Sequence, residues 1–100
     1  MTIYTHEILT YDVWGNETDG WEVNDVFRTG LRVAVPFDAS DSDVIRAAYG
    51  SLEFFSAAEV EEMLNTVEVD PICQHGTPSL YLRVKANERP LIELRPLSVG

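Results

Sequence analysis

The spacing of the apolar residues changes twice along this chain, and that change restricts the possible fold more than any other feature of the sequence. Up to residue 36, apolar and polar residues alternate in short runs, as in strands that bury one face. From residue 40 to residue 67, apolar residues recur every three or four positions, which is the helical period. After residue 71 the alternation returns. The sequence therefore predicts an α+β domain whose helices lie in the middle of the chain.

The alternating runs predict five strands that are bounded by turn residues. They cover residues 2–14, 21–27, 31–35, 80–85 and 91–95. The breaks between the first three are a Gly- and Asn-rich turn over residues 15–20 and the pair Thr29-Gly30. Pro36 ends the third strand because it has no N–H to donate. A short extra strand over residues 67–69, after the second helix, stays open as an alternative.

Two serines mark the expected helix starts. Ser40, followed three residues later by Asp43, resembles a capping box, and Gly50 is a suitable stop. Ser56 followed by Glu59 is the clearer start of a second helix. The predicted fold is one domain over residues 1–100, an antiparallel β-sheet in βββ-αα-ββ order with two helices packed on one face.

Charge is the most unusual property of the composition. Seventeen acidic residues oppose seven basic ones, for a net charge of −10, and fifteen of the acids lie in residues 1–70. Such a surface repels nucleic-acid phosphates and anionic lipids, so we expect neither direct nucleic-acid binding nor a membrane partner. Two interpretations stay open: the charge serves solubility alone, or it fits a basic protein surface.

The few basic residues gather near the C-terminus. Arg83, Lys85, Arg89 and Arg95 lie on or beside the last predicted hairpin. They could form a basic strip, but we expect them to neutralise the acidic helices across the domain.

Three observations bear on the compartment. Cys73 is the only cysteine, which excludes an intrachain disulfide and fits a reducing environment. No apolar run approaches the roughly 18 residues of a membrane-spanning helix. The first residues lack the basic and apolar regions of a secretion signal. We therefore expect a cytoplasmic protein, whose oligomeric state the sequence does not indicate.

The segment over residues 14–25 is the most distinctive stretch, because two tryptophans bracket a polar, glycine-containing loop. As a calcium loop it fails, since Asp12, Trp14 and Asn16 would fill the first three ligand positions and tryptophan cannot bind calcium. It is either a plain hairpin or a partner-binding surface, since tryptophan is enriched at binding hot spots. The candidate contact residues are Trp14, Asn16, Glu17, Asp19, Trp21, Glu22 and Asp25.

This segment also carries a resemblance. The run Trp14-Gly15-Asn16, then Asp19-Gly20, then Trp21-Glu22-Val23-Asn24 resembles a stretch near the N-terminus of small uncharacterised proteins of tailed bacteriophages. The strands around residues 80–82 and 89–94 resemble the C-terminal hairpin of the same proteins. The resemblance implies a phage-encoded protein in the cytoplasm of a host cell, and it implies no activity or site residues.

No catalytic or metal-binding constellation is recognisable. Cys73 and His75 offer two metal ligands where a zinc site needs three or four, and the only other histidine is distant His6. Phosphate-binding loops and hydrolase motifs are absent from the sequence. We therefore expect a protein without enzymatic activity, cofactor or metal.

These observations favour a small acidic binding protein that docks on a host protein with a basic surface, such as a nucleic-acid-processing enzyme, and modulates it. The alternatives are a structural or assembly protein of the phage particle, and a DNA mimic or inhibitor of the anti-CRISPR type, in which carboxylates imitate phosphates.

Overall fold

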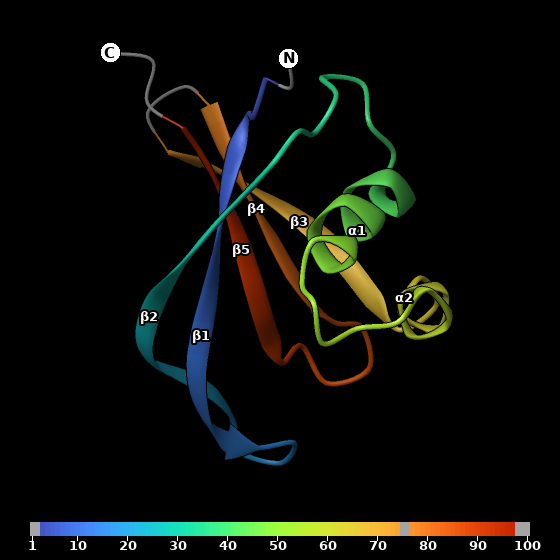
Figure 1. Ribbon diagram of the computed structural model, residues 1–100. Coiled ribbons are helices and arrows are strands. Elements are labelled where there is room, and N and C mark those ends of the chain that lie inside the picture. The colour runs from blue at the N-terminus through green and yellow to red at the C-terminus, as the bar shows by residue number, and fades with distance from the viewer. Residues whose placement is uncertain (1–2, 75–76, 98–100) are drawn as a thin grey trace.

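A computed structural model describes residues 3–74 and 77–97 of the chain. These residues form five strands and two helices, in the order ββααβββ (Figure 1). The strands are β1 (His6–Asn16), β2 (Gly20–Val33), β3 (Val67–Gln74), β4 (Thr77–Val84) and β5 (Pro90–Pro96). The helices are α1 (Asp41–Gly50) and α2 (Ala57–Met63). All strands pair antiparallel in one sheet of order β2-β1-β5-β4-β3.

The hydrophobic core lies between the helices and one face of the sheet. The sheet contributes Ile8 of β1, Leu82 of β4 and Leu94 of β5 to this core, and all three are completely buried. The helices contribute buried residues from the other side, among them Ile45 of α1 and Val60 of α2. Figure 1 shows both helices on the same side of the sheet, beside β3 and β4, while the far end of the β1–β2 hairpin projects beyond them. The predicted α+β class and the placement of both helices on one face are confirmed.

Both predicted helix starts are confirmed by their capping bonds. The Ser40 hydroxyl accepts a hydrogen bond from the Asp43 backbone N–H, and the Asp43 carboxylate accepts one from the Ser40 N–H, which completes a capping box. The Ser56 hydroxyl accepts from the Glu59 N–H at 3.2 Å. These bonds satisfy backbone donors that a helix N-terminus leaves free.

The predicted break at Thr29-Gly30 is wrong, because β2 runs without interruption for 14 residues. Gly30 has a φ of 80°, and the pairing of β1 with β2 shifts register at this point. The Thr29 hydroxyl bridges the irregularity, since it donates to the Ile8 carbonyl at 2.8 Å and accepts from the Leu31 N–H at 3.1 Å. Extra residues are therefore absorbed in a β-bulge, and two predicted strands are one.

The alternative strand at residues 67–69 is present and longer than expected. The second helix ends at Met63, and Val67 opens β3, which pairs with β4 along its whole length. Pro71 lies inside this strand, where its missing N–H is tolerated because β3 is at the edge of the sheet.

The sheet face away from the helices carries a network of polar side chains around a buried carboxylate. Glu93 lies on β5, the middle strand, and is only 5% exposed. It accepts a hydrogen bond from the Tyr11 hydroxyl at 3.1 Å and one from Arg95 Nε at 2.9 Å. The Tyr11 ring stacks on Tyr81 with centroids 5.4 Å apart. Burial, with smaller contributions from Tyr81 and the Glu93 carboxylate, raises the pKa of Tyr11.

Candidate functional site

The turn of the β1–β2 hairpin accounts for much of the distinctive sequence motif. The Asn16 side-chain carbonyl accepts hydrogen bonds from the backbone N–H groups of Thr18 (2.9 Å) and Asp19 (2.7 Å). Its amide nitrogen donates to the Asp19 carboxylate at 3.2 Å. Asn16 and Asp19, both predicted contact residues, are therefore occupied in holding the turn together.

Gly15 is required by the same turn. Its φ is 128°, and a Cβ atom at this position would overlap the carbonyl oxygen of Gly20. Trp21 pairs directly with Gly15 across the two strands, and the guanidinium of Arg89 lies 5.0 Å from the centre of a Trp21 ring. Glu17 accepts a hydrogen bond from Asn87 at 3.2 Å. Trp21 and Glu17 thus tie the hairpin to the β4–β5 turn.

The opposite side of the hairpin is different in character. Five residues share this side: Asp12, Trp14, Glu22, Asp25 and Phe27. Alternate residues of β1 lie on one side, and there Thr10 pairs with Phe27, Asp12 with Asp25 and Trp14 with Glu22. We name these five residues the hairpin face. Trp14 is 62% exposed and Phe27 50% exposed. Ile8, which is buried against the helices, lies on the same side of β1, so the hairpin face continues the helix side of the sheet. Figure 1 shows this end of the hairpin projecting beyond the helices.

The carboxylates of the hairpin face have no cationic partner in the part of the chain that the structure describes. Asp12 accepts a hydrogen bond from the Asn24 amide at 3.0 Å, and Asp25 accepts one from the Val26 N–H at 2.8 Å. None of the ion pairs among the described residues includes Asp12, Glu22 or Asp25. The negative charge of this face is therefore uncompensated.

Two of the C-terminal arginines, Arg83 and Arg95, form ion pairs within the sheet, which corrects the expectation that these residues neutralise the helices. The Arg83 guanidinium lies 3.1 Å from the carboxylate of Glu68 and 3.3 Å from that of Asp70, both on the neighbouring β3. Arg95 pairs with Glu93, its neighbour but one on β5. Both arginines therefore pair with acidic residues of the sheet, and neither pairs with a carboxylate of the hairpin face.

The structure divides the seven predicted contact residues into three groups. Trp14, Glu22 and Asp25 lie together on the hairpin face. Trp21 lies on the opposite side, Glu17 and Asp19 lie in the turn, and Asn16 is the last residue of β1 before it. Sequence reasoning missed Asp12 and Phe27. The signal was available for Asp12, because a residue two positions before Trp14 in a strand shares its side.

Metal ligands do not cluster in the part of the chain that the structure describes. No group of three or more His, Cys, Asp or Glu side chains within residues 3–74 and 77–97 is arranged to hold a metal ion. Cys73 and His75, the two possible metal ligands named from the sequence, lie outside this statement, because the described residues include neither His75 nor the side chain of Cys73.

Comparison with protein-family models, with curated proteins and with solved structures finds no match for this chain. Over the described residues, neither helix has the length and apolar character needed to cross a membrane.

Proposed function

We propose that this protein is a small acidic binding protein that docks through the hairpin face onto a basic protein surface. The observation that carries this is the exposed Trp14, surrounded by carboxylates that have no cationic partner among the described residues.

The two aromatic residues supply the binding energy in this account. Trp14 and Phe27 are both large and rigid; Trp14 is more than half exposed, and Phe27 is half exposed. Tryptophan is among the residue types most enriched at binding hot spots. Covering them with a partner removes apolar surface from water, worth about 25 cal/mol per Å² before the costs of association. Both project from a paired two-stranded ribbon, so little backbone freedom is lost when they bind.

The carboxylates supply orientation and speed of association. Asp12, Glu22 and Asp25 form an acidic rim around Trp14, in a molecule whose net charge is −10. Opposite charge on a partner accelerates the encounter and disfavours acidic competitors. A basic protein surface complements both the rim and the whole molecule.

The phage resemblance of residues 14–24 adds a context. We propose that the chain is phage-encoded, that it acts without catalysis in the cytoplasm of the host, and that its partner is a host protein. A nucleic-acid-processing enzyme fits, because such enzymes carry the basic surfaces that phosphates require.

The test uses two variants with the same change of net charge. Glu22→Lys with Asp25→Lys reverses the rim, whereas Glu53→Lys with Glu62→Lys reverses two exposed acids near the helices that lie outside the described ion pairs. Wild type and both variants are immobilised, exposed to bacterial lysate, and compared at low and at high salt. Captured proteins are identified by mass spectrometry and then bound in purified form.

We expect a basic protein that binds wild type and the Glu53/Glu62 variant and is lost from the Glu22/Asp25 variant. Equal binding by all three proteins would contradict docking through the hairpin face. Recovery of virion components alone would favour an assembly role, and competition by duplex DNA for the same partner would favour DNA mimicry.

A further inference from the structure

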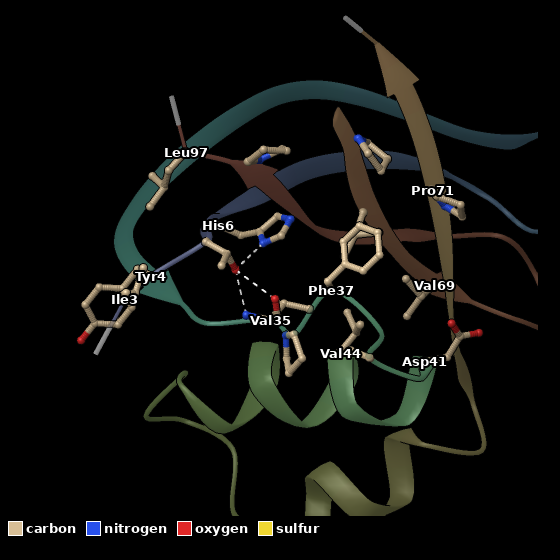
Figure 2. Close-up of a pocket in the computed structure, with 16 residues that line it drawn as sticks. Ile3, Tyr4, His6, Val35, Phe37, Asp41, Val44, Val69, Pro71 and Leu97 are labelled. Carbon is tan, nitrogen blue, oxygen red and sulfur yellow. Dashed lines mark hydrogen bonds between the residues drawn. The ribbon is translucent and has the colours of Figure 1, made fainter. Parts of the chain in front are cut away.

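A pocket of 620 Å³ lies at the opposite end of β1 from the hairpin turn. It is formed by the residues that lead into β1, the segment between β2 and α1, the first turn of α1, and parts of β3 and β4. Figure 2 shows the residues that line it, with α1 below and the strands of the sheet above. Pockets of about 300–1,000 Å³ that are lined mainly by apolar side chains are the usual form of small-molecule sites.

The walls of this pocket are apolar. Val44 of α1, Val69 of β3 and Leu80 of β4 line it, together with Val35 from the segment that follows β2. Phe37 stands at its edge with its side chain fully exposed. A ligand with an apolar body would cover Phe37 as well as fill the interior.

Few polar groups line the pocket, and most are already occupied. The Thr5 hydroxyl accepts a hydrogen bond from the Val35 N–H at 2.8 Å and lies 2.7 Å from His6 Nδ1 (Figure 2). Burial lowers the pKa of His6, so this imidazole is uncharged at neutral pH. Asp41 supplies the carboxylate of the lining, and none of the ion pairs among the described residues includes it.

The capping of α1 leaves Asp41 available. A helix N-terminus attracts anions, but in α1 the Ser40 hydroxyl and the Asp43 carboxylate already complement it. Asp41 takes no part in that capping box. The charge that a ligand meets in this pocket is therefore negative, in a molecule that is negative as a whole.

We infer that this pocket binds a small amphiphilic amine, with its apolar body against Val44, Val69 and Leu80 and its ammonium group at Asp41. A fatty-acid anion of the same shape would bring a second carboxylate against Asp41 and is disfavoured. The site is separate from the hairpin face, so this inference stands or falls independently of the proposed docking function.

The experiment titrates the whole protein with three probes that share one apolar chain: octylamine, octan-1-ol and octanoate. Calorimetry gives the affinities at neutral pH, and NMR shift changes locate the site. Asp41→Asn removes the carboxylate charge, and Asp38→Asn is the matched control, because Asp38 is exposed and does not line the pocket. Phe37→Ala removes part of the apolar edge without touching the core.

We expect octylamine to bind about two- to fivefold more tightly than octan-1-ol, with octanoate weakest, because Asp41 is exposed and an ion pair with an exposed carboxylate contributes modestly. Asp41→Asn should abolish the preference for the amine, Asp38→Asn should retain it, and Phe37→Ala should weaken all binding. Shifts should centre on Val35, Val69 and Leu80.

Equal affinity for the three probes, equal effects of the two Asp→Asn variants, or shifts confined to another surface would each overturn the inference. Failure of all three probes to bind would overturn it too. A melting curve for each variant confirms that the fold is retained in these comparisons.

Discussion

Replacing Tyr11 by Phe should destabilise the protein, because it leaves a buried carboxylate on the adjacent strand β5 without one of its donors. The Tyr11 hydroxyl donates to Glu93 Oε1, and the other oxygen of Glu93 accepts from Arg95. Glu93 is 5% exposed, so water has little access to replace a lost donor. Phe keeps the ring that stacks on Tyr81, which limits the perturbation to the hydroxyl.

The expected size follows from the geometry. Leaving one partner of a buried hydrogen bond unsatisfied costs about 1–3 kcal/mol. The 3.1 Å distance is longer than the 2.7 Å that is typical of a hydroxyl donor. We therefore expect the lower half of that range, about 1–2 kcal/mol. For a domain of this size each kcal/mol lowers the Tm by roughly 4–8 °C.

The assay is urea unfolding at neutral pH, followed by circular dichroism, with the m-value checked for constancy. In a Glu93→Gln background the same Tyr11→Phe change should cost at least about 0.5 kcal/mol less, because the acceptor is then neutral. Tyr4→Phe is the control for loss of a hydroxyl, since Tyr4 is half-exposed. A Tyr11→Phe effect no larger than that of Tyr4→Phe, or an identical effect in both backgrounds, would refute the reasoning.

Three further outcomes are expected. Gly15→Ala should destabilise by more than about 2 kcal/mol in urea unfolding, and by more than Gly20→Ala, because both positions have positive φ but only the Cβ at Gly15 meets backbone. Ser56→Ala should cost about 1 kcal/mol through the lost cap of α2, and unchanged stability would show that this helix does not depend on the cap. Burial lowers the pKa of His6 below 6.5, so the unfolded chain binds this proton more readily and stability is lost as the pH falls through that value. His6→Gln should flatten the decline between about pH 7 and pH 5, and an unchanged pH profile would contradict it.

The fold class could be predicted from the sequence because its signals are local. The capping pairs at Ser40 and Ser56 and the change of hydrophobic period depend on residues within one or two turns of each other. The strand boundaries were harder. A glycine such as Gly30 interrupts the alternation of apolar residues in the same way whether it lies in a β-bulge or in a turn between two strands. Only the pairing of β2 with β1 shows that it lies in a bulge. Two predicted strands were therefore one.

The candidate site was predicted in part for a similar reason. The sequence places Trp14 and Trp21 on either side of a loop, but which side of the ribbon each occupies depends on the register of the turn. In the structure Trp21 pairs with Gly15 and Trp14 with Glu22, so the two tryptophans lie on opposite sides. The pocket could not be predicted at all, because the residues that line it range from Ile3 to Leu97.

The most direct test of docking through the hairpin face is the fluorescence of Trp14 on binding. Trp21→Phe leaves Trp14 as the single tryptophan of the chain, and its exposed indole reports contact with a partner. The variant is titrated with the purified basic partner, while calorimetry measures the affinity independently. We expect the emission of Trp14 to move to shorter wavelength in step with binding, as the ring leaves water. Binding with unchanged affinity and unchanged emission would show that Trp14 stays in solvent, and would contradict the account.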